Sequence, residues 1–354
     1  MTGTPAVPAF KKISRNTGIP FRPRRHPMMN KRHFLRATAV AACLLSLGSA
    51  AQAAPDWLPN KPVTLVVGFA AGGAADAAAR MIAKKLGENI GQTVVVDNKG
   101  GAGGNIAHQF VAKAPADGSV LLFGSIGPLT IAPHIMKVGY NPFSDLAPIS
   151  GGVNFPNVLV VHKGAGVKNL AEFVAKAKKS PGSVDYVSTG AGSASHLAGE
   201  LFNQRAGVEM VHVPYKGGAP ALQDLLGERV TSYFAAPPTA LPHVETGKLI
   251  PLATTGLTRP AYMPNIPTVA EAGYPGFEAL NWYAFVAPGK TPTPVLERWN
   301  QEIVKVLKDP GVAEALKVHG LTPQPTTRAE FAAFMKKEYE QWGKVVKERK
   351  ITQN

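Results

Sequence analysis

Two glycine-rich turns are the parts of this sequence whose residue types point most directly to chemistry. The first follows an apolar run and reads Phe69-Ala70-Ala71-Gly72-Gly73-Ala74, and the second reads Thr189-Gly190-Ala191-Gly192-Ser193. Each turn leads into a predicted helix, whose first backbone N–H groups have no partner within the helix and suit an anion. Two such turns, about 120 residues apart, predict that two lobes hold one acidic ligand.

Several side chains beside these turns are candidate ligand contacts. Asp76 would lie in the first turn of its helix, where it either meets the ligand or, as we favour, only caps the helix and pairs with Arg80. In the second turn, the hydroxyls of Thr189, Ser193 and Ser195 either contact the ligand or serve as helix caps.

Three further positions are weighed in the same way. His196 either touches the ligand or lies on the surface of its helix, and the surface position is favoured. Tyr215 is a candidate aromatic wall of the site, whereas the adjacent Lys216 is expected to be solvated. Ser125 follows a predicted strand, at the edge where α/β proteins bind ligands.

Enzyme signatures are missing from the sequence. The run Gly124-Ser125-Ile126-Gly127 has Phe123 where a nucleophile elbow requires glycine. The histidines lack the spacing of a metal site. The segment 100–104 is glycine-rich and weakly indicates a nucleotide loop, but the first turn lacks the G-x-G-x-x-G order. We therefore expect a protein that is not an enzyme, with no catalytic residue, no metal and no cofactor.

The N-terminal segment 1–53 has the features of a secretory signal. A basic stretch follows Met29, an apolar run spans 37–47, and Ala51-Gln52-Ala53 is a small-x-small cleavage site. We expect cleavage near Ala53, a periplasmic mature protein, and translation from either Met1 or Met29, with 1–28 then unstructured or untranslated. General secretion is favoured over the twin-arginine route. A lipid anchor on Cys43, the only cysteine, is not expected.

The net charge is much smaller once this segment is removed. Segment 1–53 holds nine Lys and Arg and no acidic residue, so its removal lowers the net charge from +15 to +6. Such a charge does not indicate a nucleic-acid-binding surface. The remaining chain, 45% hydrophobic over the whole sequence, is long enough for two lobes.

Short apolar segments alternate with amphipathic ones, which predicts an α/β fold with a mainly parallel sheet in each lobe. The predicted strands are 63–69, 93–97, 120–124, 157–162, 184–189, 210–214, 230–235, 249–254 and 282–287. The predicted helices are 74–90, 105–114, 170–179, 193–206, 218–226 and 295–308, with a last helix starting at a Thr327-x-x-Glu330 capping box. Its stripe of Phe331, Phe334, Met335, Tyr339, Trp342 and Val346 is expected in the core.

Loop composition predicts two crossings between the lobes. Glycine and proline cluster around 151–157, and prolines interrupt the pattern over 259–275. We therefore assign 54–154 together with 265–354 to lobe 1, and 155–264 to lobe 2. Two crossings permit a hinge motion.

Short motifs in this order resemble the Bug family, the extracytoplasmic solute-binding proteins associated with tripartite tricarboxylate transporters. The resemblance covers nearly all of the mature chain. The motifs that carry it are Gly72-Gly73-Ala74-Ala75-Asp76, Gly100-Gly101-Ala102-Gly103-Gly104, Ala116-Asp117-Gly118, Gly190-Ala191-Gly192-Ser193 with His196, Val213-Pro214-Tyr215-Lys216-Gly217-Gly218, Pro267-Thr268-Val269-Ala270-Glu271-Ala272-Gly273 and Ala287-Pro288-Gly289-Lys290-Thr291-Pro292.

The resemblance implies a type II periplasmic-binding-protein fold, a Venus flytrap of two lobes. It implies a protein that closes on a small organic carboxylate and delivers it to the membrane subunits of a tripartite tricarboxylate-type transporter. A ligand-sensing partner of a membrane receptor kinase is the alternative. Two departures are noted: Phe69-Ala70-Ala71 stands where relatives have Tyr-Pro-Pro, and Phe234-Ala235-Ala236 lacks a common Asp, so no amino-group contact is expected.

Overall fold

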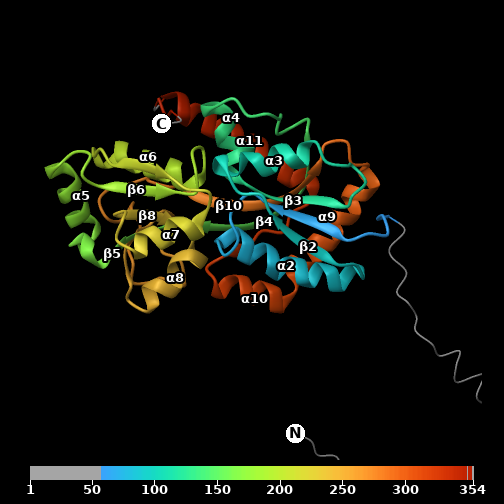
Figure 1. The fold of residues 1–354 in the computed structure, drawn as a ribbon, viewed down its shortest axis with the longest axis horizontal. Helices are drawn as coiled ribbons and strands as arrows, with labels where there is room; N and C mark the ends of the chain where they lie inside the picture. Colours follow the sequence, from blue (N-terminus) through green and yellow to red (C-terminus); the bar gives the residue numbers. More distant parts are fainter. Residues whose placement is uncertain (1–56, 349, 353–354) are drawn as a thin grey trace, which may run out of the picture. The chain divides into compact units, whose positions relative to one another are not determined.

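The computed structural model describes residues 57–348 and 350–352, so the predicted signal segment 1–53 lies outside the described residues. Two α/β lobes, each built on its own sheet, make up this part of the chain (Figure 1). Within it, no helix has both the length and the apolar character needed to cross a membrane.

The first lobe contains a six-stranded sheet in the order β11-β4-β10-β3-β1-β2. Its strands are β1 (Val63–Val67), β2 (Val94–Asn98), β3 (Val120–Ser125), β4 (Leu146–Pro156), β10 (Leu280–Pro288) and β11 (Thr322–Pro323). The second lobe contains a five-stranded sheet in the order β7-β6-β8-β5-β9. Its strands are β5 (Val158–His162), β6 (Asp185–Ser188), β7 (Val211–Pro214), β8 (Ser232–Ala235) and β9 (Leu249–Thr254).

The two-lobed α/β fold is confirmed, and most strands of each sheet run in one direction, as predicted, although each sheet also contains antiparallel pairs. In the first sheet β1 is parallel to β2 and β3, whereas β10 is antiparallel to β3 and β4, and β11 is antiparallel to β4. In the second sheet β6 is parallel to β7 and β8, whereas β5 is antiparallel to β8 and β9. The strands that follow the crossings, β5 and β10, run opposite to most of their sheets, because each brings the chain in from the other lobe at the opposite end of the sheet. β11 also runs opposite to most of the first sheet.

The chain passes between the sheets twice. The first passage is Asn157, between β4 and β5, and the second is the segment 255–279, between β9 and β10. The passages are joined because Asn157 N–H donates to Thr255 Oγ1 at 2.8 Å, and Thr255 N–H donates to Asn157 O at 2.9 Å. Thr255 Oγ1 also donates to Ala279 O at 2.7 Å. The boundaries at 154/155 and 264/265 remain predictions of where each lobe ends.

Helices cover both faces of each sheet. Those of the first lobe are α2 (Ala74–Ile90), α3 (Asn105–Ala112), α4 (Ala132–Ile135), α9 (Thr293–Lys308), α10 (Pro310–Val318) and α11 (Arg328–Glu348). Those of the second lobe are α5 (Leu170–Lys179), α6 (Ala194–Ala206), α7 (Gly218–Leu226) and α8 (Pro237–Glu245). Short helical turns occupy η1 (Ala102–Gly104), η2 (Gly127–Ile131) and η3 (Lys163–Ala165).

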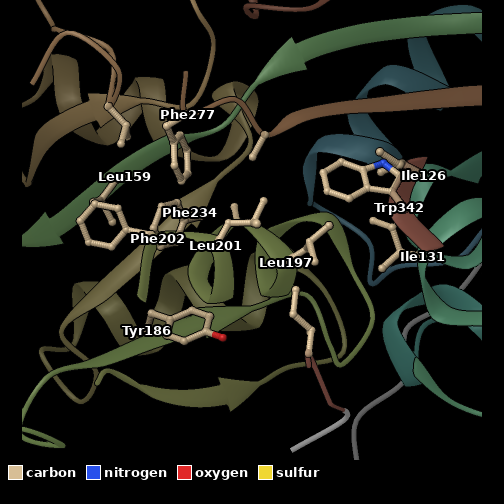
Figure 2. Packing of buried hydrophobic residues seen from close by; sticks show 14 of the residues in the cluster. Ile126, Ile131, Leu159, Tyr186, Leu197, Leu201, Phe202, Phe234, Phe277 and Trp342 are labelled. Carbon is tan, nitrogen blue, oxygen red and sulfur yellow. The ribbon is translucent and has the colours of Figure 1, made fainter. Parts of the chain in front are cut away.

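Side chains alternate across the strands between two hydrophobic layers. Val66 of β1 packs with residues of α3 and α11, whereas its neighbours Leu65 and Val67 pack with α2 and α9. The second lobe repeats this division: Leu159 packs toward α5 and α6, and Val160 packs toward α7 and α8. Figure 2 shows Phe202 of α6 beside Phe234 of β8, with 5.9 Å between the ring centroids.

The last helix begins at the predicted capping box. Thr327 N–H donates to Glu330 Oε2 at 2.8 Å, and Glu330 N–H donates to Thr327 Oγ1 at 3.2 Å. Four residues of the predicted core stripe are buried: Phe331, Met335, Trp342 and Val346. Phe334 is 41% exposed and Tyr339 is half-buried, so that part of the stripe prediction is wrong. Only part of the predicted apolar stripe of α11 therefore packs into the core.

Two phenylalanines of α11 offer a matched test of this packing. We expect Phe331→Ala to lower the free energy of unfolding by about 3–5 kcal/mol, because Phe331 is 1% exposed and its removal leaves a cavity. Phe334→Ala is the control and should cost about 1 kcal/mol or less. Urea unfolding followed by circular dichroism measures both, and equal losses for the two variants would contradict this assignment of the core.

Candidate functional site

A cavity of about 30 Å³ lies where strand ends and helix starts of both lobes meet. This volume is enough for about two water molecules. The lobes thus enclose little free space in this conformation. The lining residues are Phe69, Gly73, Ala74, Ala75, Ser125, Asn157, Thr189, Ala194, Ser195, Gly218, Tyr233, Phe234, Ala236, Thr239, Asn281 and Tyr283.

The structure brings part of the predicted site together in this cavity. Six predicted residues line it: Phe69, Gly73, Ala74, Ser125, Thr189 and Ser195. Nine others do not line it and stay predictions as ligand contacts: Ala70, Ala71, Gly72, Asp76, Gly190, Gly192, Ser193, His196 and Tyr215. Sequence reasoning did not single out Asn157 or Asn281 at the crossings, nor the polar residues Tyr233, Thr239 and Tyr283.

The lining contains no acidic, basic or histidine side chain. Its polar groups are hydroxyls, amides and the backbone at the start of helices. The run 234–236 lies at the cavity through Phe234 and Ala236, so these positions present no carboxylate to a ligand amine. A ligand here meets neutral groups only, which makes the backbone dipoles the main source of electrostatic attraction for an anion.

The start of α2 presents free amides to the cavity. Gly73 caps this helix without a side-chain hydrogen bond. Ala74 and Ala75 line the cavity, and no partner for their N–H groups is found among the described residues. Unpartnered N–H groups at a helix start form an anion site.

Asp76 has the capping role favoured from the sequence. Its Oδ2 accepts from Gly72 N–H at 2.9 Å and from Arg80 Nε at 3.0 Å, and Arg80 also pairs with Oδ1 at 2.8 Å. Burial raises the pKa of Asp76, but the hydrogen bonds from Arg80 and Gly72 outweigh burial and leave this pKa below its ordinary value. Asp76 therefore orders the first turn and holds the Gly72 amide away from a ligand.

The second turn uses most of its own amides, which differs from the expectation that they are free. Four N–H groups are donated within the turn: Thr189 to Ser195 Oγ at 3.0 Å, Gly190 to Ser188 Oγ at 3.0 Å, Gly192 to His196 Nδ1 at 3.2 Å and Ser193 to Gly190 O at 3.1 Å. Ser193 also caps α6 by accepting from His196 N–H. The amides of Ala194 and Ser195 remain without a partner among the described residues and line the cavity.

The favoured surface position of His196 is wrong. Its side chain is fully buried and stacks on His212 with 4.1 Å between the ring centroids. Burial lowers the pKa of His196 to about 3, so the ring is neutral and its Nδ1 accepts from Gly192 N–H. His196 thus orders the turn through this hydrogen bond, from a buried position outside the cavity lining.

The starts of α7 and α8 differ in whether they carry free N–H groups. Gly218, the first residue of α7, lines the cavity, and its N–H has no partner among the described residues. At α8, Pro237 and Pro238 occupy the first two positions and carry no N–H. Tyr215 is held elsewhere because its hydroxyl donates to Asp224 Oδ2 at 2.6 Å. The free amides of the second lobe therefore come from α6 and α7.

Glycine backbones of the two lobes touch one another beside the cavity. Ala70 N–H of the first lobe donates to Lys216 O of the second at 3.2 Å. A Cβ on Gly190 would lie 2.5 Å from Gly103 N, and a Cβ on Gly217 would lie 2.8 Å from Ala70 N. Real Cβ atoms do not approach this closely. The glycine-rich run 100–104, which resembled a nucleotide loop, thus serves as a contact surface between the lobes.

His108 links this contact surface to the cavity and was missed by sequence reasoning. The ring is fully buried on α3. Its Nδ1 lies 2.9 Å from Gly104 O, and Ser125 N–H points to Nε2 at 3.4 Å. Burial lowers the pKa of His108 to about 4, so Nδ1 donates and Nε2 accepts. A lone histidine within an apolar helix gives no sequence signal for this role.

The chain also matches a known protein family. Residues 78–351 match the model of the tripartite tricarboxylate transporter family receptor, TctC. BugT of Bordetella pertussis is 36% identical over 307 residues, covering 86% of this chain and 94% of BugT. The chain belongs to this family. The family consists of solute receptors of these transporters, so this chain is a solute-binding protein.

Solved structures that are similar to this chain support the two-lobed fold. The structure described as R. palustris Rpa4515 with adipate has a TM-score of 0.80 and 36% identity, covering 83% of this chain and 99% of Rpa4515. MatC from Rhodopseudomonas palustris with bound malate has a TM-score of 0.78 and 30% identity, covering 82% of this chain and all of MatC. Among the described residues of this TctC-family chain, no group of three or more His, Cys, Asp or Glu is placed to hold a metal ion.

Closure of the lobes can be tested at Gly127, the first residue of η2. A Cβ on Gly127 would lie 2.6 Å from Gly192 O of the other lobe, although φ of Gly127 is outside the left-handed region. Gly127→Ala should therefore fold normally but keep the lobes apart. We expect a larger radius of gyration than that of the wild type in small-angle X-ray scattering. Gly311→Ala at the exposed start of α10 is the control, and equal radii for all three proteins would contradict the close contact.

Stability should fall in mild acid because of the buried histidines. The pKa is lowered by burial to about 4 for His108 and about 3 for His196, whereas the unfolded chain binds these protons near pH 6.5. Stability is therefore full above pH 6.5 and is lost as pH falls toward 4, by up to roughly 1 kcal/mol per pH unit for each histidine.

Urea unfolding at pH 7.5, 6.0 and 5.0 measures this loss. His108→Gln should weaken the pH dependence, whereas His319→Gln, at an exposed position, should leave it as in the wild type. A free energy of unfolding that stays constant from pH 7.5 to 5.0 would rule out this role of the buried rings.

Proposed function

We propose that this protein is a periplasmic receptor that captures a small organic carboxylate between its lobes and delivers it to a tripartite tricarboxylate transporter. The receptor role follows from the family. The carboxylate is supported by the adipate and malate of the two related structures and by the chemistry of the cavity. The periplasmic location is supported by the signal features of 1–53 and by a similar structure described as a periplasmic transporter.

The observation that carries the proposal is the convergence of free amides from both lobes on one uncharged cavity. Ala74 and Ala75 at the start of α2 belong to the first lobe, and Ala194 and Ser195 at the start of α6 belong to the second. A carboxylate that accepts hydrogen bonds from both helix starts joins the lobes and favours the closed form. Because the anion favours one of two conformations, binding shifts the population toward closure.

The free energies are sufficient without a basic side chain. A hydrogen bond to a charged group contributes about 1.5–3 kcal/mol. Four such bonds, less the cost of ordering the ligand, are comparable with the ~8 kcal/mol of micromolar binding. Exclusion of water by the closed lobes strengthens each interaction. An ion pair is therefore not required to hold the ligand.

The ligand itself can be identified from the purified protein. Native mass spectrometry of the mature protein, prepared without refolding, should show a mass increase from a bound small molecule that is released on denaturation and proves to be a carboxylic acid. If the protein is empty, thermal shift with adipate, malate and tricarboxylates should raise the melting temperature for at least one acid. A released molecule without a carboxyl group, or no shift with any acid, would contradict the proposal.

Gly73 tests whether the start of α2 binds the ligand. Its φ of −85° suits any residue, and a Cβ would lie 3.7 Å from Gly218 N across the cavity. Gly73→Leu should fill this gap and weaken binding of the identified acid at least about tenfold, as measured by calorimetry, because more than 1.4 kcal/mol of contacts is lost. Gly311→Leu, at another helix start but exposed and outside the cavity lining, is the control. Unchanged affinity of Gly73→Leu would place the ligand elsewhere.

A further inference from the structure

Two asparagines at the crossings between the lobes form a pair beside the cavity. Asn157 lies between β4 and β5, and Asn281 lies near the start of β10. Asn281 Nδ2 donates to Asn157 Oδ1 at 3.3 Å. Asn157 is 1% exposed and Asn281 is 8% exposed, so both amides are removed from solvent. The pair joins the two segments by which the chain crosses between the sheets.

The pair has one donor and one acceptor left over. Asn157 Nδ2 and Asn281 Oδ1 are buried and have no hydrogen-bond partner among the described residues. Turning both amides over exchanges the two roles but again leaves one NH₂ and one oxygen free. A buried polar group without a partner costs about 1–3 kcal/mol. Two unpartnered groups of opposite kind on one pair of residues therefore make this pair a candidate contact for a polar group of the ligand.

The nearby hydroxyls do not satisfy these amides. Ser125 Oγ and Thr239 Oγ1 also line the cavity and are buried without partners. Each hydroxyl can turn to donate or to accept, so neither selects one kind of ligand group. The amide pair is different because its internal hydrogen bond leaves only one kind of atom free on each residue, a donor on Asn157 and an acceptor on Asn281.

The group that fits a donor beside an acceptor is one that both accepts and donates. A hydroxyl does both through one oxygen atom. A second carboxylate only accepts, so it would bring its charge against the free amide oxygen. No lysine, arginine or histidine lines the cavity to offset that repulsion. An unsubstituted alkyl group would leave both amides without partners.

We propose that the bound acid is a hydroxy monocarboxylate whose hydroxyl group lies between Asn157 and Asn281. This inference rests on the proposed function, which places the carboxylate at the starts of α2 and α6. The neutral end of the ligand then lies against the crossing segments, so the amide pair selects the ligand class while the helix starts bind its anionic end.

Matched series of acids test this selection. Each series keeps one carboxylate and the chain length and changes only the far end, as in butyrate, 4-hydroxybutyrate and succinate. The corresponding C3 series (propionate, 3-hydroxypropionate and malonate) and C5 series (valerate, 5-hydroxyvalerate and glutarate) cover other distances between the two ends. Calorimetry should show the hydroxy acid binding at least about tenfold more tightly than both of its partners in at least one series.

Variants of the pair separate selection from folding. Asn157→Leu/Asn281→Leu removes both polar partners with side chains of similar size and should bring the affinities for the hydroxy acid and for the unsubstituted acid to about the same value. Asn154→Leu, on β4 three residues before Asn157 but outside the cavity lining, should keep the preference.

The outcomes distinguish this inference from the proposed function. Binding of acids by the wild type with no hydroxyl preference, or with tighter binding of the dicarboxylates, would overturn the hydroxyl assignment and leave the receptor role intact. Retention of the preference by the double variant would also overturn it. Absence of binding by every carboxylate, in these series and in the wider panel, would contradict the proposed function itself.

Discussion

Everything at the candidate site depends on backbone amides that have no partner within their own helices. The starts of α2 and α6 present such amides from opposite lobes to a cavity without a charged side chain. A single N–H group in water attracts an anion weakly, and the attraction becomes substantial only where water is excluded. Closure is therefore part of the proposed binding, because the lobes must come together before the amides of both can bind the same anion.

The rest of the structure can be understood as support for these amides. Asp76 orders the first turn by binding Gly72 and Arg80, and His196 orders the second by accepting from Gly192. His108 connects the glycine loop around Gly104 to Ser125. None of the three needs to touch a ligand for this role. Their shared effect is to fix the backbone so that little conformational entropy is lost when an anion binds.

Much of the fold was predictable because it is local in the sequence. The bounds of α2, α5 and α7 match the predicted ranges, since their hydrophobic periodicity is strong. The strand β4 was missed because its run of Ser150, Gly151 and Gly152 lacks apolar alternation, and its pairing with β10 comes from far along the chain. The helix α8 was missed because prolines at 237, 238 and 242 normally argue against a helix.

The candidate site was predictable only where it is made of turns. Glycine and hydroxyl residues beside a strand end located Gly73, Ala74 and Thr189. Asn157 and Asn281 escaped notice because they come together only when two distant crossings are joined. The direction of the side chains also decided between alternatives that the sequence left open: His196 turned inward, and Tyr215 turned toward Asp224.

The contact between glycine backbones has a consequence for how such receptors diverge. The surfaces that meet on closure, around Gly103, Gly190 and Gly217, are made of main chain, whereas the far wall of the cavity is made of side chains from β8 and β10. A substitution at Tyr233 or Asn281 can therefore change the preferred solute without altering the fit of one lobe on the other. The residues that form the contact between the lobes are thus separate from the residues that select the solute. A few substitutions in the cavity lining can therefore give one scaffold a new ligand preference.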